Sequence, residues 1–281
     1  MIEHSGKWIQ QIAGLQHDDG SWGFFHSLSQ PTKTQPMTTE QALRRLRVLG
    51  LSKDDVPIKR ALQYMRDCLN NKTQPPDRRE KVLNWDAFQA HMMAAWIRIF
   101  EPDDSLASPV SIMWAGIIKQ SFKSGSFDEE IYASEYRKRI PVLHKGERLI
   151  VPSQFYMVNL LCGMLDETTE NAFVDYIINY PTGIFYVNNS RIAELPAVFA
   201  SREASQYLAA LEQIVGYSCA GRKMVFAKQW ILSQKDEYGE WDMGASVKDG
   251  IYFPISDSWR NPKDRKNDCT SRITKLLKAM E

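Results

Sequence analysis

The sequence predicts an all-α fold of about five helical hairpins, and three observations lead to it. Residues that begin and end helices recur along the chain, the apolar residues between them have helical spacing, and only residues 183–187 have an extended pattern. Successive helices with apolar faces bury those faces against one another. We therefore expect an α/α arrangement of paired helices around a shared core.

The first clear helix start is a T-x-x-Q capping box formed by Thr38 and Gln41. In such a box the Thr oxygen and the Gln side chain each satisfy a free backbone group at the helix start. Gly50 ends this helix, because glycine readily adopts the backbone conformation that stops one. A second helix is expected over residues 52–70, where an S-x-x-D pattern precedes apolar residues at helical spacing.

The rest of the chain continues this pairing. Pro109 stands at the start of a helix, where proline is tolerated, and Pro181 stops another. The expected pairs are residues 84–100 with 109–122, 153–165 with 169–180, 201–216 with 219–233, and 270–280 with the opening helix, 4–15.

The net charge of the chain limits the kinds of molecule that it is expected to bind. The 281 residues include 35 Lys and Arg against 34 Asp and Glu, which gives a net charge of +1. This balance argues against nucleic-acid binding and against a membrane-surface protein, because both depend on clustered basic residues. The sequence contains neither a P-loop nor a G-x-G-x-x-G motif after a strand, so no nucleotide site is expected.

Targeting and domain signals are also few. No apolar run reaches the roughly 20 residues of a membrane span, and the N-terminus lacks a secretory pattern. The four cysteines are isolated, which suggests reduced thiols in a cytoplasmic protein. Because no linker or shift in composition divides the chain, we expect one domain over residues 1–281.

The helix expected over residues 84–100 is apolar on nearly every side and is therefore expected to be buried. It carries a narrow polar stripe of Asn84, His91 and Arg98 at intervals of seven residues, with alanines beside it. Small residues next to a polar stripe leave room for a ligand. The alternative, which is the more usual case, is that the stripe meets water or pairs with neighbouring helices.

Two segments near opposite ends of the chain share the form Q-x(3,4)-G-x-W. One runs from Gln16 to Trp22 and the other from Gln234 to Trp241, and each follows an aromatic–aliphatic pair in the helix before it. We expect the Gln to bond amides at the start of the next helix, the Gly to permit the reversal, and the Trp to cover the junction. The motif is therefore interpreted as structural rather than catalytic.

These segments resemble the QW repeat of squalene and oxidosqualene cyclases and the related DGxW turns of protein prenyltransferase β subunits. The tract from Asp19 to Gly23, followed by Thr39, Ala42 and Leu43, is especially similar to one such repeat. The resemblance implies an α/α toroid of about five to six helical hairpins, in which inner helices surround a central apolar cavity. It also implies a small hydrophobic ligand of isoprenoid type, with prenyl diphosphates among the candidates, which the protein binds, cyclises or transfers.

The chemistry of that superfamily is not carried over as a whole. The sequence has no DxDD motif, which supplies the catalytic acid of class II terpene cyclases. Prenyltransferase zinc ligands are an Asp, a nearby Cys and a later His, but no His follows Asp268 and Cys269. The isolated cysteines also lack His partners for the zinc cluster of a lanthionine-type cyclase. No metal and no cofactor are therefore expected.

The remaining candidates are polar and aromatic residues near the expected cavity mouth. A buried Asp86 or Glu40 would supply a proton, and aromatic faces would stabilise a carbocation. Glu40 also has an ordinary explanation, since a carboxylate favours the first turn of a helix. The catalytic candidates are Asp86, Glu40 and His91, and the substrate-binding candidates are Trp22, Phe25, His26, Trp85, Trp96, Arg98, Trp114 and Tyr156.

Two other functions stay open. One is a noncatalytic toroid that binds a hydrophobic ligand or a peptide, which agrees with the missing DxDD motif and zinc ligands. The other is a carbohydrate-active α/α barrel, in which Trp85 and Tyr156 stack on sugars and Asp86 with Glu40 form the acid and base pair. A protein partner also stays open, because a single toroid often works beside another domain in the families that the sequence resembles.

Overall fold

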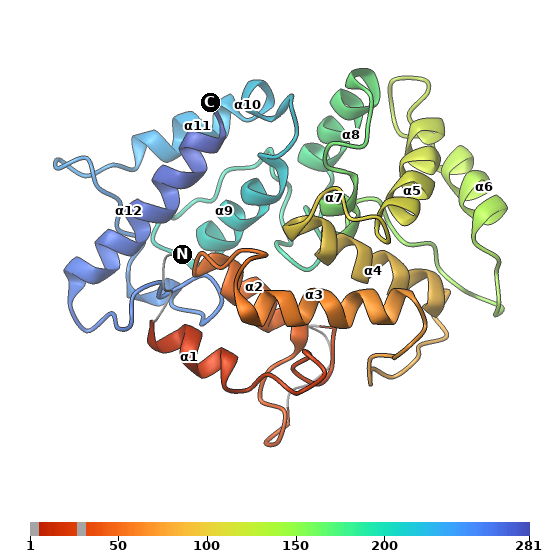
Figure 1. Ribbon diagram of the computed structural model, residues 1–281. Coiled ribbons are helices and arrows are strands. Elements are labelled where there is room, and N and C mark those ends of the chain that lie inside the picture. Colours follow the sequence, from red (N-terminus) through yellow and green to blue (C-terminus); the bar gives the residue numbers. More distant parts are fainter. Residues whose placement is uncertain (1–5, 27–31) are drawn as a thin grey trace.

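The computed structural model describes residues 6–26 and 32–281, and these residues form an all-α protein (Figure 1). The helices are α1 Lys7–Ala13, α2 Thr39–Val48, α3 Val56–Leu69, α4 Trp85–Phe100, α5 Ser108–Ser121, α6 Glu129–Arg139, α7 Phe155–Leu161, α8 Glu167–Asn179, α9 Arg202–Ile214, α10 Ala220–Lys223, α11 Val225–Ser233 and α12 Pro262–Ala279, with a short 3-10 helix at Ala245–Val247. The predicted all-α class is confirmed. Within the described ranges β-pairing is limited to one isolated bridge between Gln154 and Phe185, the latter in the segment expected to be extended.

The helix starts follow the predicted capping chemistry. The Thr38 side chain accepts a hydrogen bond from the Gln41 backbone N–H, and the Gln41 side chain accepts one from the Thr38 N–H. Asn84 caps α4 by accepting from the Ala87 N–H at 3.1 Å. The capping box and the boundaries of α2 and α4 were therefore available from local sequence alone.

Three elements differ from the expectation. Helix α6 was not predicted, because only Tyr132 and Tyr136 on it are buried and it has no apolar stripe. Helix α12 begins at Pro262 rather than at residue 270, since Asn261 caps it and proline occupies its first position. The expected helix over 219–233 is divided at Met224, where the backbone leaves helical geometry at φ −105° and ψ 19°.

Helix α4 lies at the centre of the packing. It packs against α3, α5 and α7, and ten of its side chains are buried, as its apolar sequence predicts. Figure 1 shows α2, α4 and α9 in the middle of the molecule, with α8 above α4, α5 and α6 to one side, and α10, α11 and α12 to the other. One continuous cluster of buried apolar side chains extends from Ile12 to Met280. None of the described helices has the length and hydropathy of a membrane-spanning segment.

The two Q-x(3,4)-G-x-W segments fold into matching turns. The Trp22 indole N–H donates to the Ile12 carbonyl at 2.7 Å, and the Trp241 indole donates to the Ile231 carbonyl at 2.7 Å. Gly20 has φ +93°, and a Cβ there would lie 2.3 Å from the Arg60 carbonyl oxygen, so this turn requires glycine. Each tryptophan thus closes the junction between two helices, as its structural interpretation predicted.

The role expected for the glutamines is wrong. Gln16 donates to two carbonyl oxygens, those of Gly20 and Pro57, rather than to amides at the start of the next helix. The amide group of a glutamine carries both donors and an acceptor. Gln16 uses its donors because the groups within its reach are the Gly20 and Pro57 carbonyls. Gln234 donates only to the neighbouring Ser233 hydroxyl among the described residues, so it does not join two elements.

Candidate functional site

Glu40, in the first turn of α2, is fully buried and joins three helices. Its carboxylate accepts hydrogen bonds from the Trp96 indole of α4 at 3.2 Å and from the Tyr156 hydroxyl of α7 at 3.1 Å. Arg44, one turn further along α2, forms an ion pair with it at 3.4 Å. The structure therefore brings together Glu40, Trp96 and Tyr156, three residues that the sequence singled out separately.

An aromatic cluster surrounds the Tyr156 ring. The ring centroids of His26 and His91 lie 6.1 and 6.2 Å from that of Tyr156, and Trp114 lies 4.8 Å from His91. Trp85 joins through Phe88, which contacts both Trp85 and Tyr156 with its ring. All of these side chains are buried, so the predicted aromatic and histidine candidates form part of the core.

Burial of this cluster shifts the pKa values of His91 and Tyr156. Burial lowers the pKa of His91 to about 3, so the imidazole is neutral near pH 7. Neither of its ring nitrogens has a hydrogen-bond partner among the described residues. Burial, with the nearby charge of Glu40, raises the pKa of Tyr156 well above its usual value. The Glu40 carboxylate accepts from three donors and so holds the Trp96, Tyr156 and Arg44 side chains in position.

Other candidates lie elsewhere. Asp86 is at the surface, where its carboxylate is 68% exposed and pairs with Arg79 at 2.5 Å, so it lacks the burial that its proposed role required. Arg98 donates to the Leu160 and Cys162 carbonyls at the end of α7 and is occupied by these bonds. Phe25 is fully buried, and its backbone N–H donates to the buried Asp77 carboxylate at 2.6 Å.

A cavity of about 390 Å³ opens on the other side of Trp96. Its walls come from helices α2, α4, α7, α9 and α12, with one or two other helices between successive members along the chain, and from residues before α12. The lining side chains include Arg44, Arg47, Val48, Trp96, Phe155, Glu212, Gln213, Tyr252, Ile255, Arg272, Lys275 and Leu276. Trp96 is the one predicted binding residue among them.

The cavity is cationic. Four Arg or Lys side chains and one carboxylate, Glu212, line it, which leaves a net charge of +3. The cavity therefore departs from the wholly apolar interior that the sequence resemblance implied. The sequence signal was a group of three arginines within α2, of which Arg44 and Arg47 line the cavity and Arg45 donates to the Ile251 carbonyl. The other lining cations, Arg272 and Lys275, lie far away in the sequence.

The four cations differ in how they are held. Arg44 stacks on the Phe155 ring at 4.5 Å, and Arg272 pairs with Glu212 at 2.7 Å and lies over the Tyr252 ring at 4.7 Å. Arg47 and Lys275 have no ion pair within the described part of the chain. Burial lowers the pKa of Arg47, an effect that the charge of Glu212 opposes. An anion in the cavity would stabilise the charge of Arg47.

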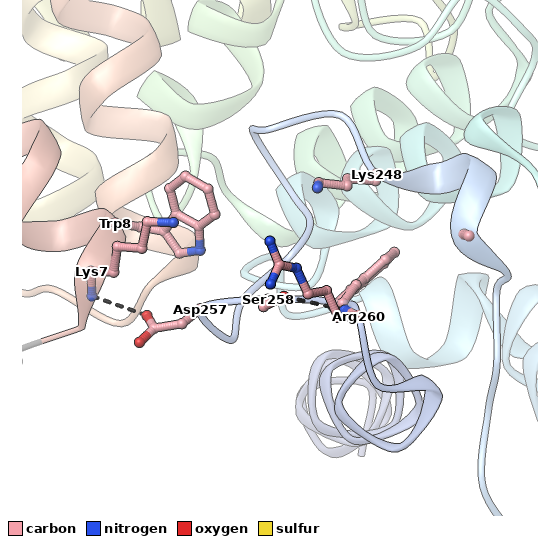
Figure 2. A pocket seen from close by; sticks show the side chains of 8 residues that line it. Lys7, Trp8, Lys248, Asp257, Ser258 and Arg260 are labelled. Carbon is pink, nitrogen blue, oxygen red and sulfur yellow. Dashed lines mark hydrogen bonds between the residues drawn. The ribbon is translucent and has the colours of Figure 1, made fainter.

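A second hollow, of about 630 Å³, lies at the surface between α1 and the segment before α12 (Figure 2). Lys7, Lys248 and Arg260 line it beside Trp8, and in Figure 2 the charged ends of Lys248 and Arg260 point toward the space beside Trp8. The Trp8 indole donates to the Ser256 carbonyl at 2.9 Å. Most of its side chains are exposed, so it encloses a ligand less well than the cavity beside Trp96 does.

Within the described residues no three His, Cys, Asp or Glu side chains are placed to hold a metal ion, and the four cysteines are free thiols. Comparison with protein-family models, curated proteins and solved structures gives no match for this chain.

Proposed function

We propose that this chain is a single-domain α/α toroid that binds an anionic ligand with an apolar tail, in the class of prenyl diphosphates, in its central cavity. The observation that carries this proposal is the composition of the cavity wall. The lining residues carry a net charge of +3, which Glu40, the buried partner of Arg44, reduces to +2, and these charges lie beside the Trp96, Phe155 and Tyr252 rings. The volume of about 390 Å³ is within the range of about 300–1,000 Å³ typical of small-molecule sites.

The order of the helices around the cavity supports the toroid. The lining helices α2, α4, α7, α9 and α12 alternate along the chain with helices that do not line it. Such alternation is what an inner and an outer layer of paired helices produces. Helix α6 is then an addition to the outer layer between α5 and α7.

The proposed activity is binding rather than acid-initiated cyclisation. Asp86 lies at the surface, and Glu40 accepts from three donors, so neither is placed as a proton donor toward the cavity. A carbohydrate-active site would need two carboxylates across the cavity. Among the described lining residues Glu212 is the one carboxylate, and it pairs with Arg272.

Calorimetric titration of the whole chain with farnesyl diphosphate, farnesol and inorganic diphosphate tests this function. We expect farnesyl diphosphate to bind more tightly than either of the others, because only it contacts both the cations and the apolar wall. Native mass spectrometry of freshly purified protein checks whether such a ligand is carried from cells, and product analysis checks whether it is converted.

Substitutions separate the cavity from general charge effects. Arg47→Gln and Lys275→Gln are each expected to weaken diphosphate binding about tenfold, the loss typical of one charge-assisted contact. Lys278→Gln is the matched control, because Lys278 is exposed on the same helix and does not line the cavity. Equal binding of farnesol and farnesyl diphosphate, or the same loss in Lys278→Gln, contradicts the proposal.

A further inference from the structure

Positive charge is concentrated in two surface segments, residues 78–83 and 137–148, which we call the basic loops. Together they contain eight Lys or Arg residues and two Glu residues, a net charge of +6. The whole chain has a net charge of +1, so the remaining residues have a net charge of −5. The balanced overall charge argued against a membrane-surface protein, but it conceals these two segments of clustered basic residues.

The basic loops lie side by side although more than fifty residues separate them. The Arg148 backbone N–H donates to the Val82 carbonyl at 2.7 Å, and the Asn84 side chain donates to the Pro141 carbonyl at 2.9 Å. The first loop precedes α4 and the second includes the end of α6, at the lower right of Figure 1. The two segments therefore form one surface.

Most of the cations on this surface are available to a partner. Arg79, Lys138 and Arg139 are paired with carboxylates. The other five are exposed and have no ion pair within the described part of the chain, namely Arg78, Lys81, Arg137, Lys145 and Arg148. Unpaired, exposed basic residues at this density attract an anionic surface.

Aliphatic side chains project from the same loops. Val82 is 46% exposed, Val142 is 55% exposed and Leu143 is 53% exposed. Neither loop contains Phe, Trp or Tyr. Exposed aliphatic side chains among basic residues match the two layers of a bilayer interface, in which anionic headgroups lie above the acyl chains.

We propose that the basic loops dock on a membrane surface that contains anionic lipids, with Val82, Val142 and Leu143 inserted at the level of the headgroups. This inference is independent of the function proposed for the central cavity. The aliphatic side chains favour a membrane over nucleic acid, whose single strands are bound mainly through aromatic stacking. The protein then lies on the bilayer without crossing it.

Flotation of the full chain with phosphatidylcholine vesicles, and with vesicles that contain about one-third phosphatidylserine, tests the proposal. We expect binding to the anionic vesicles alone, and weaker binding as salt concentration rises. The Lys81→Gln, Lys145→Gln double variant is expected to bind about 25-fold more weakly, about fivefold for each basic residue removed. The Lys53→Gln, Lys59→Gln double variant removes the same charge from another exposed segment and should bind as the wild type does.

The apolar part is tested separately. The Val142→Ser, Leu143→Ser double variant is expected to bind anionic vesicles about tenfold more weakly. Val56→Ser with Ile112→Ser is its control, since those side chains are 67% and 62% exposed on other elements. Circular dichroism establishes that each variant is folded.

Three results overturn the proposal. The first is equal binding to neutral and anionic vesicles, or binding to neither. The second is a loss of vesicle binding on removing Lys81 and Lys145 with none on removing Val142 and Leu143, which would show electrostatic adsorption without insertion of the aliphatic side chains. The third is tighter binding to a single-stranded oligonucleotide than to anionic vesicles, which assigns the surface to nucleic acid.

Discussion

Trp22 and Trp241 occupy the same hydrogen-bonded setting at opposite ends of the chain. Besides its indole bond to the preceding helix, each donates its backbone N–H to a threonine of the following helix, Trp22 to Thr39 at 2.9 Å and Trp241 to Thr270 at 3.0 Å. Five residues after each threonine stands a cation of the central cavity, Arg44 and Lys275 respectively. The repeated turn therefore fixes the position of a charged residue in two of the lining helices.

This setting predicts unequal effects of removing the two threonine hydroxyls. Thr39→Val leaves the buried Trp22 N–H without an acceptor and is expected to lower the free energy of unfolding by about 2 kcal/mol. Thr270 is only partly buried, so Thr270→Val is expected to cost about 1 kcal/mol. Urea unfolding followed by circular dichroism measures both, with Thr39→Ser and Thr270→Ser as controls that keep the hydroxyl. A loss of stability in the Ser variants with none in the Val variants would show that the methyl contacts matter, not the hydroxyl.

The fully buried carboxylate of Glu40 predicts a large loss of stability on neutralisation. Glu40→Gln removes the ion pair with Arg44 and replaces one of the two carboxylate oxygens, which accept separately from Trp96 and Tyr156, by an amide NH2 group that cannot accept. We expect the free energy of unfolding to fall by roughly 3 kcal/mol, the usual cost of breaking a buried pair. Tyr156→Phe, which removes one of its donors, should cost about 1 kcal/mol. Chemical denaturation compares them, and a loss no larger in Glu40→Gln than in Tyr156→Phe contradicts the ordering role of the carboxylate.

Much of the fold follows from local sequence because its signals are local. The capping box at Thr38, the cap at Asn84 and the apolar face of α4 each act within one helix. Helix α6 escaped prediction because its exposed residues, charged along its length, lack a hydrophobic stripe. The helix expected over residues 270–280 begins earlier, at Pro262, where proline marks a helix start.

The site was less predictable because its parts come from distant segments. Glu40, Trp96 and Tyr156 were each identified by residue type, but nothing in the sequence links them across 116 positions. The cationic character of the cavity was missed for the same reason. The arginines of α2 meet Arg272 and Lys275 only because α2 and α12 both face the cavity. The spacing of residues within one helix does not predict which residues of another helix will line the same cavity.

Arg98 and Arg47 are predicted to have different roles, Arg98 in the stability of the fold and Arg47 in ligand binding. Arg98 donates to main-chain carbonyls of Leu160 and Cys162, so Arg98→Gln should lower the free energy of unfolding by about 2–3 kcal/mol and leave ligand affinity unchanged. Arg47 has one long bond, to Gln213 at 3.5 Å, so Arg47→Gln should change stability by less than about 1 kcal/mol. Unfolding and calorimetric titration on the same samples separate the two effects. A fall in diphosphate affinity for folded Arg98→Gln contradicts this assignment.

Buried His91 predicts how stability depends on pH. Its pKa in the folded chain, about 3, is below the ordinary 6.5, so as pH falls below 6.5 the unfolded chain takes up a proton that the folded chain does not. The contribution of the neutral imidazole to the free energy of unfolding is fully present above pH 6.5. It falls by up to about 1.4 kcal/mol for each pH unit between pH 6.5 and pH 3. Carboxylates act lower, since bonds from Lys119 and Thr169 reduce the pKa of Asp166 from 3.8 to about 2.

Urea unfolding between about pH 4.5 and 7 therefore isolates the histidine. His91→Leu, which has a similar volume and no titrating group, should flatten the slope in this range while changing stability at pH 7 by about 1 kcal/mol or less. His144→Gln alters an exposed histidine and should keep the slope of the wild type. If His91→Leu loses stability with acid as steeply as the wild type does, another buried group takes up the proton on unfolding, and the imidazole is not the source of the slope.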